Sequence, residues 1–305
     1  FNSIHAQPSP RYGGWRSNEQ IPAPVDHEHT LLIDASGFDP EGDDSLARAI
    51  VEAVDVGFRK IVVWGTLGHR FLGNGLGLRG ADLRLEVYGS PGDYLGSGID
   101  GTEMIVHNNG QDQVAQIMKG GTLVVHGDVG QTFMYAAKGG RAFVLGSAAG
   151  RPLINAVGSP RVVINGTCLD YLAESFMAGD PLHDGGFVVL NGVGFDDQGH
   201  VVDLDTPYPG GNLFSLASGG AIFIRDPRRK VGSDQLNGGA IEPLTDEHWA
   251  LIEPLLVENE QWFGLPINRL LTVDGALRAP GDVYRVIVPV RQQALQPEQA
   301  WVAKH

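Results

Sequence analysis

Glycine recurs at a nearly fixed interval through the middle of the chain. Gly127 and Gly146 are 19 residues apart, Gly146 and Gly166 are 20 apart, and Gly89 precedes Gly127 by 38, which is twice 19. Each of these glycines follows a short run of aliphatic residues. A period near 20 residues is typical of solenoids, in which similar supersecondary units stack on one another and bury a continuous core.

Seven segments have the composition of short strands that end at glycine or another turn residue. They are Ile61–Gly65, Leu83–Gly89, Met104–His107, Leu123–Gly127, Ala142–Gly146, Val162–Gly166 and Phe187–Gly192. Glycine pairs precede three of them, at Gly120-Gly121, Gly139-Gly140 and Gly185-Gly186, and a fourth pair, Gly219-Gly220, precedes a later apolar run. Because glycine adopts positive φ without a steric penalty, we interpret these glycines as the corners of coils. The pattern predicts a mainly β protein, a right-handed β-solenoid (single-stranded β-helix) of about six or seven coils.

The flanking segments have other patterns and are expected to cap the two ends of the stack. Residues Phe1–His29 are polar and without a period, which indicates an extended arm. A strand from Thr30 to Ser36 and a helix capped by Asp43 or Asp44 and closed at Gly57 complete an α/β cap. We therefore divide the chain into an N-terminal arm and cap (1–58), the solenoid (59–226) and a C-terminal tail (227–305).

Within the last part of the chain, two segments are predicted in more detail. Residues Val193–Leu216 are expected to form a polar loop before the last solenoid strand, Ala221–Arg225. In the tail, Thr245 is expected to cap a helix that Pro254 kinks or divides, and Tyr284–Val288 to form a strand.

Charge and cysteine content exclude several classes of function. The formal net charge is −14, which repels phosphate backbones and anionic membrane surfaces, so we expect neither nucleic acid nor membrane as a partner. Cys168 is the single cysteine, which is incompatible with an internal disulfide or with an iron–sulfur cluster held by this chain alone. The first residues lack the basic and apolar regions of a signal peptide, and we expect a cytoplasmic location.

One short motif invites a dinucleotide-binding interpretation, which its context disfavours. Gly96-Ser97-Gly98-Ile99-Asp100-Gly101 satisfies G-x-G-x-x-G, but a Rossmann fingerprint requires a helix to begin within it. The residues that follow, Thr102–Val106, are apolar and β-branched, which favours a strand. We interpret Gly96, Gly98 and Gly101 as turn residues of a coil.

Three clusters carry chemically active side chains, and for each the plainer interpretation is preferred. Asp26-His27-Glu28-His29 holds four candidate metal ligands but belongs to the expected arm. Cys168 with Asp170 and His183 resembles a thiol nucleophile with partners, yet it follows a strand where a small buried residue suffices. The carboxylates Asp93, Asp100 and Glu103 stand near one another, as in sugar-cleaving sites, but aspartates beside glycine are ordinary turn formers. We expect no catalytic residue, cofactor site or metal site in this chain.

Two surface features remain as candidates for binding. His107 and His126 end successive strands at equivalent positions, which allows them to stack along one face as a binding surface; a solvated edge is the plainer interpretation. Arg225, Arg228, Arg229 and Lys230 form a basic cluster on an acidic protein and are candidates for partner docking; a solvated linker is the alternative.

The segment Gly92-Asp93-Tyr94-Leu95-Gly96-Ser97-Gly98-Ile99-Asp100-Gly101, with its downstream glycine-paired coils, resembles the GXGXG family. This family includes the C-terminal β-helix domain of the glutamate synthase large subunit and the solenoid subunit of formylmethanofuran dehydrogenase. The resemblance covers about residues 61–226, and Ser159-Pro160 departs from it where a glycine pair is expected.

The resemblance implies a structural subunit without its own catalytic centre in a glutamate-synthase-like oxidoreductase or amidotransferase complex. Its partners would be glutaminase-type chains and chains carrying FMN and iron–sulfur clusters. Two alternatives stay open: the solenoid subunit of a formylmethanofuran dehydrogenase or formyltransferase/hydrolase complex, with a molybdenum or tungsten cofactor in a partner, and an independent β-helix enzyme acting on carbohydrate.

Overall fold

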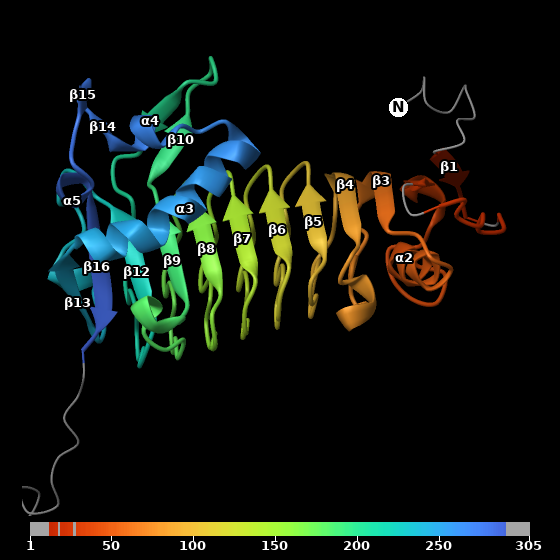
Figure 1. Ribbon diagram of the computed structural model, residues 1–305, viewed down its shortest axis with the longest axis horizontal. Coiled ribbons are helices and arrows are strands. Elements are labelled where there is room, and N and C mark those ends of the chain that lie inside the picture. The colour runs from red at the N-terminus through yellow and green to blue at the C-terminus, as the bar shows by residue number, and fades with distance from the viewer. Residues whose placement is uncertain (1–11, 18, 27–28, 291–305) are drawn as a thin grey trace, which may run out of the picture.

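The computed structural model describes residues 12–17, 19–26 and 29–290, and its dominant feature is one sheet of 12 strands. The strands of this sheet are β1 (Tyr12–Trp15), β2 (Thr30–Asp34), β3 (Lys60–Leu67), β4 (Arg84–Ser90), β5 (Glu103–Val106), β6 (Thr122–Val125), β7 (Arg141–Val144), β8 (Arg161–Ile164), β9 (Phe187–Leu190), β12 (Ala221–Arg225), β16 (Tyr284–Pro289) and β13 (Gly239–Pro243). From β1 to β12 each strand is parallel to its neighbour, whereas β16 and β13 close the sheet in antiparallel pairing. Figure 1 shows the strands side by side along the long axis of the molecule.

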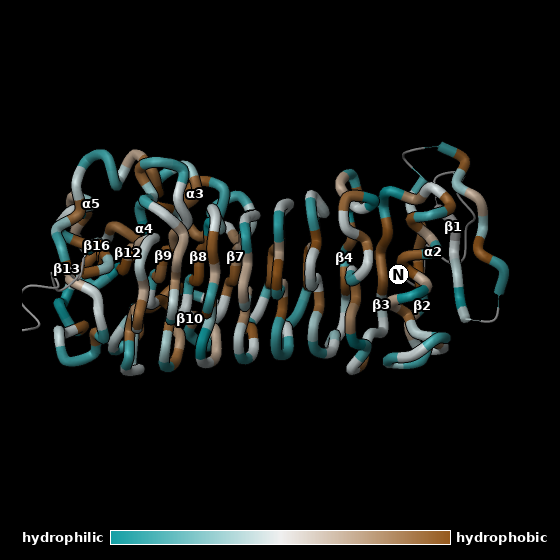
Figure 2. The backbone as a smooth tube through the Cα atoms, turned by 90° about the horizontal axis from the view of Figure 1, so that it is seen from below, coloured by the Kyte–Doolittle hydropathy of each residue, from teal (hydrophilic) through white to brown (hydrophobic). Residues whose placement is uncertain are grey.

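The remaining elements lie around this sheet. They are the helices α2 (Leu46–Asp55), α3 (Asp246–Phe263), α4 (Ile267–Leu271) and α5 (Pro280–Val283), the hairpins β10–β11 (Val193–Phe195 and Val201–Asp203) and β14–β15 (Thr272–Val273 and Ala276–Leu277), and the short 3-10 turns η1 (Ala35–Gly37), η2 (Gly77–Gly80), η3 (Pro181–His183) and η4 (Ser233–Gln235). The mainly β solenoid of about six turns that the glycine period predicts is confirmed. Figure 2 shows its coils as a row of narrow loops that follow one another along the long axis.

Each solenoid strand has an inner and an outer face, and both are apolar in the C-terminal half of the stack. The inner row Val125, Val144, Ile164, Leu190, Ile224 is in register across the coils and belongs to the main core. The outer row Val124, Phe143, Val163, Val189, Phe223 belongs to a second core beneath α3. A parallel strand buried on both sides has an uninterrupted hydrophobic sequence, which explains runs such as Phe187–Leu190.

On the side opposite the sheet, each coil contains a segment that we call the coil arm, and its backbone conformation is unusual. In seven successive arms, positive φ recurs at alternate residues, beginning with Phe71, Tyr94, Gln113, Thr132, Arg151, Tyr171 and Asn212. In the arm that begins at Tyr94 the next two positions are Gly96 and Gly98, but in the following arms they are ordinary residues such as Ala115 and Ile117.

The expectation that glycine supplies these sharp turns therefore holds only for the first arms. A non-glycine residue with left-handed φ costs roughly 1–2 kcal/mol, so the later arms need compensation. Hydrogen bonds to both neighbouring coils provide it: the amide of Ala115 donates to the Leu95 carbonyl at 2.7 Å, and that of Ile117 to the Tyr135 carbonyl at 2.8 Å.

At the N-terminal end, the cap contains the expected helix and one strand that the sequence did not indicate. Helix α2 is capped by Ser45, whose hydroxyl accepts from the Arg48 amide at 3.4 Å, and not by Asp43 or Asp44 as predicted. Gly57 follows it with φ +113, as expected. The predicted extended arm contributes β1, which pairs with β2 and buries Trp15, so it is partly integrated into the sheet.

At the C-terminal end, two predictions need correction. Residues 193–216 are not simply a polar loop, because they include the β10–β11 hairpin and then return to the stack as a coil arm. Helix α3 is continuous through Pro254 and is capped by Thr245 as expected. Pro254 lies on the exposed side of α3 while Ile252, Leu255 and Leu256 pack on the sheet, so packing holds the helix together across the missing amide.

Candidate functional site

One position of the coil repeats carries the most varied polar chemistry in the molecule. It is the outward-facing position at or just after the end of each strand, and we call it the strand-end row. From β4 to β12 its members are Tyr88, His107, His126, Leu145, Asn165, Asn191 and Arg225. Its first three members carry aromatic or imidazole rings, Leu145 follows, and its last three members are two amides and a guanidinium.

The rings at the start of the row form a continuous stack. Tyr88 and His107 lie 3.9 Å apart between ring centroids at an angle of 10°, and His107 and His126 lie 5.2 Å apart at 12°. Phe263, the last residue of α3, meets His126 edge-on at 5.1 Å. The predicted stacking of the two histidines is therefore confirmed, and α3 ends against it.

Glu86 holds this stack from one side. Its carboxylate accepts from the Tyr88 hydroxyl at 3.1 Å and from Nε2 of His107 at 3.1 Å, so that nitrogen carries the proton. Burial alone would raise the pKa of Glu86, but hydrogen bonds from Arg84, His107 and Tyr88 lower it overall. The pKa of His126 is lowered by burial and by the neighbouring charge of His107.

The amides in the second half of the row bind the capping helix. Asn165 and Asn259 of α3 exchange two amide hydrogen bonds, of 2.9 and 3.1 Å. Asn191 donates to Asn165 at 2.9 Å and accepts from the Tyr284 hydroxyl at 2.8 Å. All four side chains are fully buried, and burial raises the pKa of Tyr284. The network sets the position of α3 on the stack.

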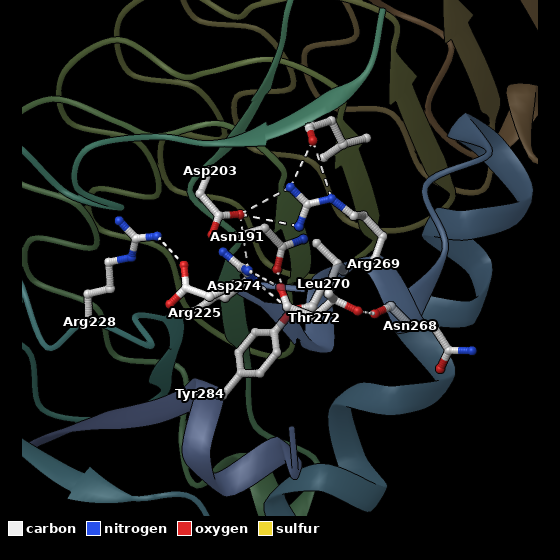
Figure 3. Close-up of polar contacts among 11 residues, drawn as sticks. Asn191, Asp203, Arg225, Arg228, Asn268, Arg269, Leu270, Thr272, Asp274 and Tyr284 are labelled. Carbon is white, nitrogen blue, oxygen red and sulfur yellow. Dashed lines mark hydrogen bonds and ion pairs between the residues drawn. The ribbon is translucent and has the colours of Figure 1, made fainter. Parts of the chain in front are cut away.

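Arg225 ends the row and organises the polar cluster shown in Figure 3. Its side chain is only 2% exposed, and it donates through Nε to the Leu270 carbonyl at 2.6 Å and pairs with Asp203 at 3.1 Å. Arg269 of α4 also reaches Asp203, at 3.3 Å, and donates to the Val201 carbonyl at 2.7 Å. Asp203 thus joins the β10–β11 hairpin to β12 and to α4.

The predicted basic cluster is divided by this arrangement. Arg225 is buried and fully engaged within the protein, so it is not available for docking as the sequence suggested. Arg228, Arg229 and Lys230 are exposed, and Arg228 pairs with Asp274 at 2.9 Å. Asp226 is buried, accepts from the amides of Lys230 and Val231 at 2.8 and 3.0 Å, and pairs with Arg285, which fixes the loop that carries the exposed cations.

Beside the cluster lies an open groove of about 620 Å³ between β11 and the turn that joins β14 to β15. Its wall contains Val202 and Leu204 together with the charged side chains of Asp203, Asp205, Arg228, Lys230, Arg269 and Asp274. Cations and carboxylates are interleaved in it, so it has no strong preference for one sign of charge.

The turn glycines of the prediction meet two different requirements. Positive φ is found at Gly96 (+68), Gly98 (+70), Gly101 (+100), Gly121 (+94) and Gly140 (+86). Close approach governs the others: an added Cβ would lie 3.0 Å from Asp100 at Gly120, 2.5 Å from the Lys119 carbonyl at Gly139, 2.5 Å from the Ala178 carbonyl at Gly185 and 2.6 Å from Pro160 at Gly186. Gly96–Gly101 lead into strand β5 and open no helix, which agrees with the turn interpretation.

The other candidate side chains from the sequence are buried or contact separate partners. Cys168 is fully buried, and burial strongly raises the pKa of its thiol, while His183 pairs with Asp180 at 2.9 Å. Asp93 lies 3.5 Å from Arg70, and Glu103 pairs with Arg84. Among the residues that the structure describes, no three His, Cys, Asp or Glu side chains converge as metal ligands, and none of its helices is long and apolar enough to cross a membrane.

The histidine-rich candidate motif is only partly covered by the structure. His27 and Glu28 lie outside the described residues. His29 is buried, accepts from the Val25 amide at 3.0 Å and packs on Phe58.

Sequence reasoning missed Asp203, Asp226, Arg269 and Asn259. Asn165 and Asn191 had a usable signal, because both follow a strand at the position where His107 and His126 stand.

Comparisons with known proteins agree with the architecture. The model of the family described as GXGXG motif matches residues 60–272, which extends from β3 through α4. The uncharacterized protein MJ1350 of Methanocaldococcus jannaschii is 35% identical over 259 residues, covering 82% of the chain and 92% of that relative.

Proposed function

The chain belongs to the GXGXG motif family, and from that premise we propose that it is a non-catalytic scaffolding subunit of a glutamate-synthase-like assembly in the cytoplasm. Separate chains would supply the glutaminase chemistry, the FMN and the iron–sulfur clusters. The solenoid chain would hold those units at a set separation.

The observation that carries this proposal is the continuous sheet itself. Ten parallel strands, β1 to β9 and β12, stack with a single register shift, between β3 and β4, over a core of buried side chains, and α3 closes the outer face of the last coils. A close-packed stack of this kind transmits load with little compression. Two of the reactive side chains in the described residues, Cys168 and Glu103, are respectively buried in this stack and paired with Arg84.

Docking of partners would use features that do not stabilise the stack. Of the exposed cations Arg228, Arg229 and Lys230, the first and the last line the groove between β11 and β14–β15. Figure 1 shows β10, β14 and β15 projecting beyond the edge of the sheet. Phe195 and Leu277 of the two hairpins are 44% and 64% exposed, which adds apolar area to the same region.

A second candidate function comes from the same family membership. The solenoid subunit of a formylmethanofuran dehydrogenase or formyltransferase/hydrolase complex would need the same stiff stack, with a molybdenum or tungsten cofactor in a partner. The identity of the partner chains separates the two functions.

Affinity purification of the tagged chain from its native cells tests the proposal. We expect co-purifying chains of the glutaminase and flavin/iron–sulfur types and a visible spectrum with flavin and cluster bands. Recovery of a molybdenum or tungsten chain would favour the second function. Recovery of the chain alone as a monomer would contradict both.

A further inference from the structure

The coil arms carry a second group of exposed cations, on the side of the coils away from the sheet. Lys119 and Lys138 occupy the same position in consecutive coils, because the Lys119 amide donates to the Ile99 carbonyl at 2.9 Å and the Lys138 amide to the Met118 carbonyl at 2.7 Å. Neighbouring rungs of a parallel stack are about 4.8 Å apart, so the two ammonium groups start from adjacent rungs.

These two cations are unneutralised within the described structure. Both side chains are exposed, and within the described residues neither ammonium has a carboxylate at ion-pair distance; Asp100, one rung before Lys119, forms no ion pair with it. By contrast, arginines at the strand starts are paired, for example Arg141 with Glu258 at 3.3 Å. Like charges in directly adjacent rungs destabilise a sheet-like stack.

The arrangement is also unusual for this composition. The chain contains five lysines, at positions 60, 119, 138, 230 and 304, and has a net charge of −14. A protein with so many carboxylates and so few lysines nevertheless places two of those lysines in register, with no acidic partner of their own among the described residues. An external acidic group would remove the repulsion.

Exposed apolar side chains occur on the same and on nearby arms. Ile117 lies on the arm of Lys119 and Tyr135 on the arm of Lys138, while Met177 lies two coils further along, and they are 40%, 36% and 49% exposed. The row of the lysines continues as Val157 and Met177, which form an isolated parallel bridge between two coils. Exposed aromatic, methionine and aliphatic side chains around a few cations have the composition of protein–protein interfaces.

We propose that this arm patch, comprising Lys119, Lys138, Ile117, Tyr135 and Met177, is a docking surface for a partner protein with a carboxylate-rich, partly apolar face. The proposal rests on the scaffolding function and adds a second attachment point, on the coil arms, to the one at the C-terminal cap. A protein partner is favoured over phosphate polyanions because Ile117, Tyr135 and Met177 offer apolar contact area that a folded protein face can match and a polyanion cannot.

Amine footprinting of the purified assembly tests this surface. An acylating reagent is applied to the assembly and to the isolated chain, and the extent of modification is measured at each lysine by mass spectrometry. We expect Lys119 and Lys138 to be protected in the assembly. Equal modification of these two lysines in both states would overturn the proposal.

Charge variants of Lys119 and Lys138 provide a second test. Reassembly of K119E/K138E with the partner chains should weaken by at least about tenfold in dissociation constant, because like charges would then face each other. K119R/K138R keeps both charges and should retain wild-type affinity. Unchanged affinity of K119E/K138E would overturn the proposal.

The outcomes distinguish a failure of the scaffolding function from a failure of the arm patch. If no assembly is recovered, the scaffolding function fails and the arm patch fails with it. If the assembly forms while Lys119 and Lys138 stay open to acylation, only the arm patch is wrong.

Discussion

At the residue scale, glycine serves two separate purposes in the coils. Gly98 has φ +70 and open space around its Cα, and one coil later Ile117 occupies the same position with φ +56. Gly121 has φ +94 and in addition touches the next coil, since an added Cβ would lie 2.3 Å from the Thr102 carbonyl oxygen. Close contact with the next coil therefore excludes a side chain at positions such as Gly121, whereas positions such as Gly98 accept one.

Alanine substitution should separate these purposes. We expect Gly98→Ala to lower the free energy of unfolding by about 1 kcal/mol, the cost of a left-handed residue. Gly121→Ala should lower it by several times as much, because the carbonyl of the neighbouring coil cannot move away without breaking the stack. Urea titration followed by circular dichroism measures both; equal effects would show that close approach is unimportant at Gly121.

Asn259 is a second residue whose role can be isolated. Replacing it by leucine leaves Asn165 without its reciprocal amide partner in a buried site, which should cost about 1–3 kcal/mol. The effect should appear as faster amide exchange along α3. Gln261→Ala, on the exposed side of the same helix, is the matched control and should leave the exchange rates unchanged. Equal exchange in both variants would contradict the role given to Asn259.

At the scale of elements, the ring stack couples the end of α3 to the first half of the strand-end row. His126 lies between His107, whose Nε2 proton is held by Glu86, and Phe263. A proton on His126 is disfavoured in the folded state, because its pKa is lowered there, whereas the unfolded chain binds it at the ordinary histidine pKa of about 6.5. Stability should therefore fall as the pH drops through that ordinary value.

An NMR titration of the histidine side chains measures this directly. The midpoint of His126 should lie below the ordinary histidine value, and His107→Gln should raise it, because the neighbouring charge is removed. His126→Gln should also reduce the loss of stability on acidification. A His126 midpoint at or above the ordinary value would contradict the stacking account.

The elements also show what the sequence can and cannot specify. The strands were predictable because alternate glycine and aliphatic runs repeat with the period of the coil. The β10–β11 hairpin was not, because its pairing is a single local event without a repeat, and its strands are three residues long. Continuity of α3 through Pro254 was not predictable either, since it depends on packing against strands that lie far away in the sequence.

The candidate site was predictable to a smaller extent. The stacking of His107 on His126 followed from their equivalent positions in successive coils. The burial of Arg225 did not follow, because a run of basic residues contains no information on which member faces the interior. Only the folded cap brings Asp203 and the Leu270 carbonyl to that guanidinium.

At the scale of the whole molecule, the stack should tolerate removal of one complete coil. Deleting residues 122–140 removes 19 residues and lets β5 pair with β7, since Glu103, Thr122 and Arg141 share one register position. The shortened chain should keep its β circular dichroism and unfold cooperatively. Deleting 122–132 removes part of a coil, misplaces every inward side chain that follows, and should prevent folding. Equal behaviour of the two deletions would contradict the coil repeat.

Native mass spectrometry of the assembly purified through this chain tests the central claim most directly. After gentle dissociation, the account predicts that the chain is released at the mass of its polypeptide alone while flavin and cluster masses stay with other chains. A released chain that carries a prosthetic group, or a chain found in no larger particle, would contradict its assignment as a non-catalytic scaffold.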